Sequence, residues 1–79
     1  MFDESTSLMG TRYLYSWPKR EACFFETSGI IYTMGGRPTF YVDGDYVYEF
    51  DTGKPAFSIR ESRLYPFPGG SQPSYYFGN

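Results

Sequence analysis

One pattern of four residues recurs along the chain and limits the folds that are open to it. The pattern is an aliphatic residue, a tyrosine, any residue and a large apolar residue. It occurs at Leu14-Tyr15-Ser16-Trp17, Ile31-Tyr32-Thr33-Met34, Val47-Tyr48-Glu49-Phe50 and Leu64-Tyr65-Pro66-Phe67. The steps between its tyrosines are 17, 16 and 17 residues. Such regular self-similarity indicates four copies of one supersecondary unit.

A second pattern follows each copy of the first and begins with proline in three of the four cases. These segments are Pro38-Thr39-Phe40-Tyr41-Val42, Pro55-Ala56-Phe57-Ser58-Ile59, Pro73-Ser74-Tyr75-Tyr76-Phe77 and the degenerate Glu21-Ala22-Cys23-Phe24-Phe25. Sequences rich in Tyr and Pro match themselves easily, but two patterns that keep one order through four copies argue against coincidence. Both are short, aromatic or β-branched, and bounded by Gly, Pro, Asp or Ser, which predicts strands. No apolar periodicity favours a helix.

The alternation of side chains assigns residues to faces, because neighbours along a strand point to opposite sides. We expect the last residue of the first pattern to lie in the core with its tyrosine, which predicts buried Trp17, Met34, Phe50 and Phe67. On the second strands, alternation pairs Cys23 with Phe25, Phe40 with Val42, Phe57 with Ile59 and Tyr75 with Phe77. The opposite, outer face then carries Phe24, Tyr41 and Tyr76.

The connections predict an antiparallel meander. Asp43-Gly44 lies between two strands and is typical of a two-residue type I′ hairpin, and the other connections are short enough for antiparallel neighbours. The chain opens with a first-pattern strand, 13–17, and ends with a second-pattern strand, 73–77, so pairing of these ends would complete a fourth hairpin and remove both exposed edges. We therefore predict an all-β, propeller-like domain of four hairpin repeats with approximate four-fold symmetry. A polar N-terminal arm, 1–11, precedes the repeats, 12–77, within a single domain, 1–79.

The repeat resembles the units of the four-fold β-flower proteins, which are small bacterial proteins of unknown function. The units of that family look like Gly-x-Pro-hydrophobic-small-Tyr-Ile followed by Ile-Tyr-x-Phe. The matching segments here run from Gly36 to Val42 with 47–50, and from Gly53 to Ile59 with 64–67. The first copy departs at Glu21, and its turn is one residue longer. The resemblance implies the closed fold and supplies no catalytic, ligand or cofactor residues.

Composition excludes several kinds of chemistry. The chain has 79 residues, one cysteine and no histidine. An internal disulfide is therefore impossible, and a zinc site lacks its ligands. Cys23, at a patterned apolar position, is predicted to be a buried and inert thiol, since no histidine is present as its base. We expect no catalytic residues, no metal and no cofactor: Asp43 and Asp45 form only a fragment of a calcium loop.

The net charge and the distribution of basic residues limit the kinds of partner that are expected. The net charge is −2 and no run of Lys or Arg is present, so a nucleic acid partner is not expected. Apolar stretches are far shorter than a membrane span. The acidic start of the chain differs from a signal peptide, so a cytoplasmic location is expected, although a processed secreted chain would have the same composition.

The aromatic content is the one feature that suggests a function. Eighteen aromatic residues, nine Tyr, eight Phe and one Trp, exceed what a core of this size hides. Tyr and Trp favour interfaces, so we expect a non-enzymatic module for protein binding or self-assembly, with Phe24, Tyr41 and Tyr76 as its interface. Binding of a small ligand or carbohydrate to exposed aromatics is the alternative. Solvated tyrosines that merely cover the sheet would explain the same residues.

Overall fold

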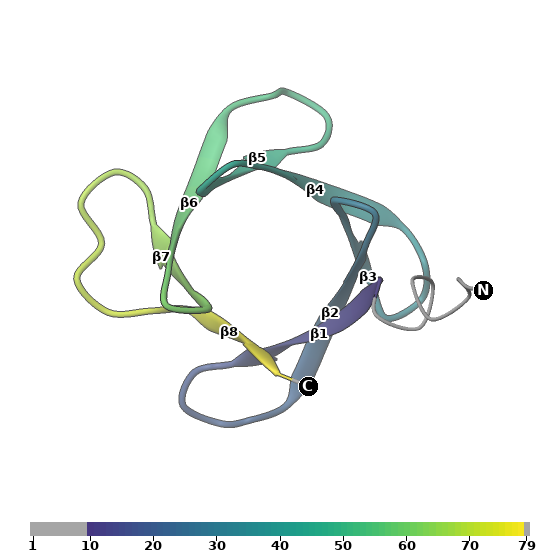
Figure 1. The fold of residues 1–79 in the computed structure, drawn as a ribbon, viewed down its shortest axis with the longest axis horizontal. Helices are drawn as coiled ribbons and strands as arrows, with labels where there is room; N and C mark the ends of the chain where they lie inside the picture. The colour runs from purple at the N-terminus through teal and green to yellow at the C-terminus, as the bar shows by residue number, and fades with distance from the viewer. Residues whose placement is uncertain (1–9, 79) are drawn as a thin grey trace.

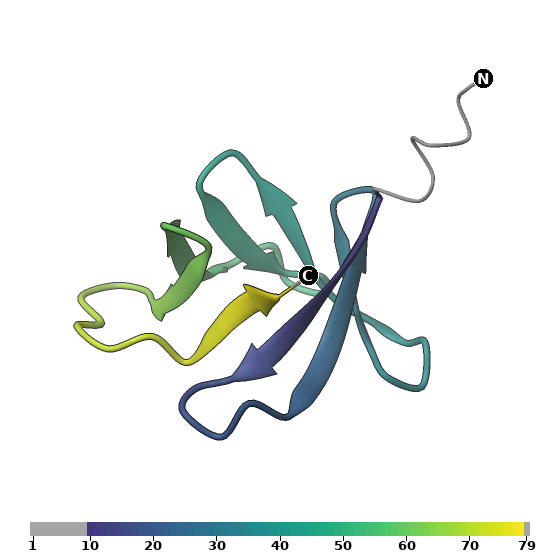
Figure 2. The same cartoon turned by 60° about the horizontal axis from the view of Figure 1, so that its bottom comes forward.

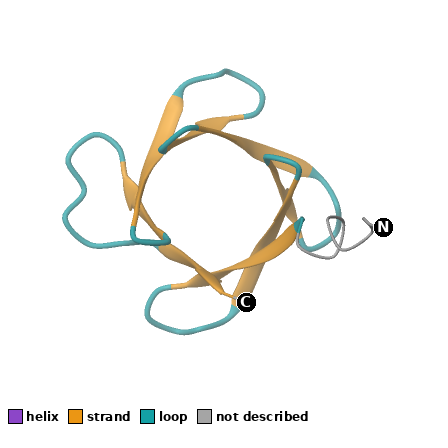
Figure 3. Cartoon of the chain, in the orientation of Figure 1, coloured by secondary structure: helices purple, strands orange, loops and turns teal. Residues whose placement is uncertain are grey.

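Eight antiparallel strands form one closed barrel in the computed structural model, which describes residues 10–78 (Figure 1). Strands and loops account for the whole of this part of the chain (Figure 3), and no helix in it is long and apolar enough to cross a membrane. The predicted all-β meander is therefore confirmed. The strands are β1 Thr11–Ser16, β2 Ala22–Thr27, β3 Ile30–Thr33, β4 Pro38–Asp43, β5 Tyr46–Glu49, β6 Pro55–Arg60, β7 Arg63–Pro66 and β8 Tyr75–Gly78.

The first and last strands close the barrel. β1 and β8 lie side by side (Figure 2), with Leu14 opposite Phe77 and Tyr15 opposite Tyr76. This confirms the predicted pairing of 13–17 with 73–77. Of the predicted N-terminal arm, residues 1–9 lie outside the described part, and β1 already begins at Thr11.

The two ends of the barrel differ in their connections. At one end, two-residue turns join β2 to β3, β4 to β5 and β6 to β7, so the expectation of a longer turn in the first copy is wrong. The predicted type I′ turn at Asp43-Gly44 is wrong, because Asp43 pairs with Tyr46 and the turn is formed by Gly44 and Asp45. Only Gly44 has a positive φ, 64°; a type I′ turn needs two such residues, whereas type II′ needs one.

The longer connections project outward from the other end of the barrel (Figure 1). We call them petals; they are residues 17–21, 34–37, 50–54 and 67–74. Irregularities in strand pairing occur at equivalent places, between Leu14 and Tyr15, between Ile31 and Tyr32, and between Val47 and Tyr48. A bulge bends its strand and increases the local twist. In these three copies the chain therefore turns away from the barrel axis at the repeated tyrosine.

The core is built from layers of equivalent residues. The aliphatic residue of the first pattern is at most 1% exposed in every copy: Leu14, Ile31, Val47 and Leu64. Next to this layer, four aromatic residues form a closed ring of edge-to-face contacts, with consecutive centroids 5.8, 5.6, 5.7 and 5.4 Å apart. The members of this inner aromatic ring are Phe24, Phe40, Phe57 and Tyr75.

Three predictions about faces are wrong. The repeated tyrosines Tyr15, Tyr32, Tyr48 and Tyr65 lie on the outer face and not in the core, because their neighbours Leu14, Ile31, Val47 and Leu64 take the inward positions. Trp17, Met34, Phe50 and Phe67 are 40 to 51% exposed instead of buried, because each follows the last residue of its strand, where the chain has already left the barrel. Phe24 lies in the core and not on the outer face. Its pairing with Leu14 shows that Phe24, rather than Cys23, occupies the position of Phe40 and Phe57.

Stacked pairs cover the outer face. Three of the repeated tyrosines stack on the ring directly opposite them in the neighbouring strand, in the pairs Tyr15–Tyr76, Tyr32–Phe25 and Tyr48–Tyr41, with centroids 5.1 to 5.5 Å apart. The fourth, Tyr65, faces Ser58, and the guanidinium of Arg60 lies over its ring at 4.0 Å. The outer tyrosines are thus partnered within the sheet.

One charged residue lies in the barrel. Glu26 is 7% exposed and takes the inward position that Val42, Ile59 and Phe77 hold in the other copies. Its carboxylate accepts hydrogen bonds from Arg12 Nε at 3.0 Å and from the backbone N–H of Gly29 at 2.9 Å. The Arg12 guanidinium also lies 3.9 Å from the centre of the Phe77 ring. The first copy is therefore distinct from the others inside the barrel.

Candidate functional site

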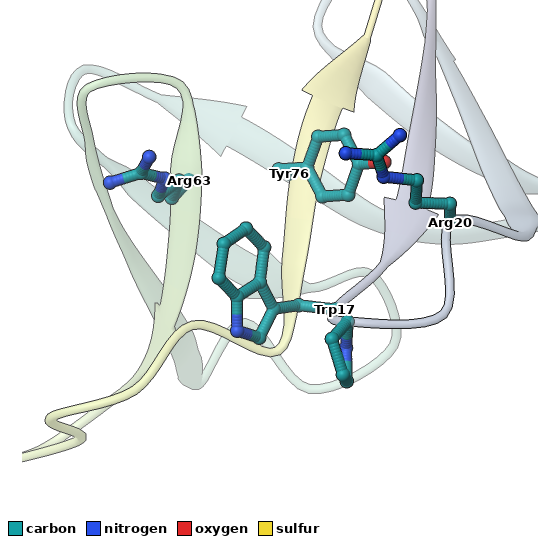
Figure 4. A pocket seen from close by; sticks show the side chains of 5 residues that line it. Trp17, Arg20, Arg63 and Tyr76 are labelled. Carbon is teal, nitrogen blue, oxygen red and sulfur yellow. The ribbon is translucent and has the colours of Figure 1, made fainter.

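A pocket of about 540 Å³ lies beside the connection from β1 to β2 (Figure 4). Its walls are Trp17, Pro18 and Arg20 from this connection, Arg63 from the start of β7 and Tyr76 from the outer face of β8. The volume is in the usual range for small-ligand sites, about 300–1,000 Å³. The pocket is open to solvent and is bordered by the outer wall of the barrel.

Backbone pairing holds these residues together. The Trp17 N–H donates to the Ser74 carbonyl at 3.0 Å, which fixes the start of the connection against β8. Arg63 and Tyr76 are directly opposite one another in the β7–β8 pair. The Arg20 N–H donates to the Ser16 carbonyl at 2.9 Å and closes the loop above the pocket. The site is therefore anchored to the two strands that complete the barrel.

Two aromatic rings form a right-angled corner in the pocket. The rings of Trp17 and Tyr76 are 5.9 Å apart with an angle of 90° between their planes. Tyr76 is also held by Tyr15, which stacks on it with 5.5 Å between the ring centroids. A flat ligand stacked on one wall of this corner would meet the other wall with its edge, and both geometries are favourable for aromatic rings.

The pocket carries positive charge. Figure 4 shows the side chains of Arg20 and Arg63 on either side of the Tyr76 ring. Arg63 lies 5.5 Å from the Trp17 ring centre, a looser contact than the 3.9 and 4.0 Å of the other two arginine–aromatic pairs. Its ion pair with Glu61 spans 3.9 Å, and the Glu61 side chain is 86% exposed. Such a pair contributes little. Among residues 10–78, Arg20 has no ion pair, so both guanidinium groups are available to a ligand.

A second pocket, of about 390 Å³, occupies the related position beside the connection from β7 to β8. There Phe67 takes the place of Trp17, Ser58 that of Tyr76 and Tyr46 that of Arg63. Asp45 adds a carboxylate to its wall, and its only arginine, Arg60, already lies over Tyr65. The two pockets thus lie at repeat-related positions of the barrel but are lined by different side chains.

The predicted interface residues separate in the structure. Tyr76 contributes to the pocket, Tyr41 lies on β4 and stacks on Tyr48, and Phe24 faces the core. The sequence interpretation missed Trp17, Arg20 and Arg63 as site residues. Two signals pointed to two of these residues: Trp17 is the only tryptophan, and Arg20 is in the copy that departs most from the repeat. No sequence signal marked Arg63.

Other candidate chemistry is not assembled in the described residues. Within 10–78, no group of three or more Cys, Asp or Glu side chains could hold a metal ion. Cys23 is half-buried and not buried as predicted, because its neighbour Phe24 takes the inward position on β2. Its Sγ lies 3.4 Å from the carbonyl oxygen of Glu21. The Trp17 pocket is therefore the best-defined candidate.

The architecture defines the class of the protein as an all-β, eight-stranded, closed antiparallel barrel of hairpin repeats. No protein-family model, curated protein or solved structure matches the chain significantly. Membership of the β-flower family stays a prediction.

Proposed function

We propose that this chain is a non-enzymatic binding module that holds a small ring-bearing ligand in the Trp17 pocket. The right-angled corner of Trp17 and Tyr76 carries this proposal, because it places two aromatic rings in the wall of one pocket. The absence of histidine from the sequence removes the commonest general base. Binding without chemistry is the activity that this set of side chains supports best.

Calorimetric titration tests the proposal. The probes are benzyl alcohol, benzoate, phenyl phosphate and methyl β-glucoside, and the variants are Trp17→Ala and its repeat-related match Phe67→Ala. We expect saturable binding of at least one ring compound, weakened about tenfold or more by Trp17→Ala and unchanged by Phe67→Ala. Equal loss in both variants, or no saturable binding to the wild type, would contradict the proposal.

Self-association is a second candidate, supported by the exposed side chains at the petal end. Met34, Phe50 and Phe67 are exposed at equivalent positions outside the Trp17 pocket. All three follow strands that run in the same direction, so they surround the same end of the barrel. Apolar surface gathered at one end commonly marks an interface, and a second copy would be its simplest partner.

Sedimentation at several protein concentrations tests this candidate. The double variant Met34→Ser with Phe50→Ser should stay folded and sediment at a lower mass than the wild type at high concentration. The control Lys19→Ser changes an exposed residue of another petal and should leave the mass unaltered. A wild type that is monomeric at every concentration would remove self-association as a function.

A further inference from the structure

We infer that the ligand of the Trp17 pocket is an aromatic anion, a flat ring that carries a carboxylate or phosphate group. This inference rests on the proposed ligand-binding function and specifies its chemistry. The rings of Trp17 and Tyr76 would hold the flat part, and the guanidinium groups of Arg20 and Arg63 would hold the charged part. Arginine is suited to this role because its planar fork of N–H donors matches both carboxylate and phosphate.

The backbone of Arg20 is the first argument. Arg20, Gly36 and Gly53 are equivalent in three hairpins: each donates its N–H to the carbonyl of the residue that precedes the exposed apolar position, namely Ser16, Thr33 and Glu49. All three have a positive φ, of 64°, 95° and 75°. Glycine adopts this conformation freely, whereas a residue with a side chain is strained in it. The first copy thus keeps an arginine where folding alone favours glycine, and this strained residue is one of the two arginines that line the pocket.

The contrast between the two related pockets is the second argument. In the Trp17 pocket two arginines and no carboxylate line the wall, although the whole chain has a net charge of −2. In the Phe67 pocket a carboxylate, Asp45, accompanies one arginine. Repeat-related positions of the backbone line both pockets, so the positive charge of the Trp17 pocket comes from its own side chains and not from the fold.

The placement of the charges relative to the rings is the third argument. Both arginines line the same pocket as the two rings and are on opposite sides of the Tyr76 ring in the view of Figure 4, so an anionic group on a bound ring would share the pocket with both charges. Arg63 contacts Trp17 loosely, at 5.5 Å, and about two-fifths of its side chain is exposed. It is therefore free to turn from the indole toward a ligand.

Titrations that separate ring from charge test the inference. The probes are benzoate and phenyl phosphate, which have both features, benzyl alcohol, which has only the ring, and acetate, which has only the charge. The readouts are calorimetry and the indole N–H resonance of the single tryptophan, Trp17. We expect benzoate or phenyl phosphate to bind at least tenfold more tightly than benzyl alcohol and acetate, with the advantage reduced by added salt. The tighter of the two charged probes identifies the preferred anionic group.

Variants provide the matched comparison. Arg20→Gly should weaken the charged probes about tenfold, leave benzyl alcohol unchanged and keep or raise the melting temperature, since it removes the strained side chain. Arg63→Gln should weaken the same probes. Arg37→Ala, which removes an equal charge from the next petal, should have no effect.

The outcomes of these titrations test the preference for an anion separately from the proposed binding of a ring. If benzyl alcohol binds as tightly as the charged probes, or if Arg37→Ala weakens binding as much as Arg20→Gly, the anion inference is overturned while ring binding stands. If no ring compound binds the wild type, both the inference and the proposed function fall.

Discussion

Tyr75 in the last strand packs edge to face against Phe24 in the second, with 5.4 Å between the ring centroids, and this contact completes the inner aromatic ring. Phe24 also contacts Phe40 at 5.8 Å, so its loss would open the ring on both sides. We predict that Phe24→Ala lowers the free energy of unfolding by about 3–5 kcal/mol. Urea denaturation measures the change. Cys23→Ala, one residue away, serves as the control and should cost less than about 1 kcal/mol; the reverse order would mean that the register of β2 is wrong.

The aliphatic layer and the exposed apolar residues should respond very differently to truncation. Leu64 is fully buried, so Leu64→Ala should cost about 2–5 kcal/mol through lost burial and a residual cavity. Phe50 is substantially exposed, so Phe50→Ala should cost about 1 kcal/mol or less, although phenylalanine is the larger side chain. Thermal and urea unfolding of the two variants provide the comparison. A greater loss for Phe50→Ala would place that residue in the core after all.

Glu26 should be important for stability through its two hydrogen bonds. Glu26→Ala removes the partner of Arg12 and leaves the Gly29 N–H without its acceptor, which should cost about 1–3 kcal/mol. Glu26→Gln keeps an oxygen for the turn and should cost less. Chemical denaturation distinguishes the two variants, and equal losses would show that the ionic part of the interaction dominates.

A substitution in the turn between β6 and β7 should stabilise the protein. Glu61 and Ser62 have φ of 53° and 66°, a conformation that residues with side chains adopt at a cost. Ser62→Gly should therefore raise the free energy of unfolding by about 0.5–1 kcal/mol. The control is Ser71→Gly, at an exposed serine whose φ is not positive, which should not stabilise the protein. A fall in melting temperature for Ser62→Gly would contradict the strain argument.

The sequence predicted the strands and the closure because both depend on periodicity alone. It failed on the faces because both sides of these strands are apolar, so alternation shows which residues share a face but not which face is inside. Trp17 was assigned to the core, although Leu14, on the opposite side of the strand, is also apolar. The barrel interior takes the aliphatic residue, and the bulge after it directs the chain outward before the tryptophan is reached.

The register of the second strand in the first copy was also missed, although the spacing contained it. Phe24 precedes Tyr32 by the same interval that separates Phe40 from Tyr48 and Phe57 from Tyr65. Counting residues backward from each repeated tyrosine, across the short turn, aligns the preceding strands correctly, because these turns have one length. Counting residues forward from each repeated tyrosine, across the petal, misaligns the following strands, because the petals differ in length. The pocket was beyond prediction, since Arg63 and Trp17 are brought together only when the barrel closes.

Closure by the two ends of the chain has a consequence for how copies of the protein can combine. Seven of the eight strand pairs join neighbours in the sequence, whereas the pairing of Leu14 with Phe77 spans nearly the whole described chain and has the largest loop-closure entropy to overcome. It should be the last contact to form and the first to open. An opened molecule presents the edges of β1 and β8, and a second opened molecule presents the complementary edges. At high concentration two chains would complete one another's fourth hairpin and yield an intertwined dimer by strand exchange, with every strand pair of the single barrel retained.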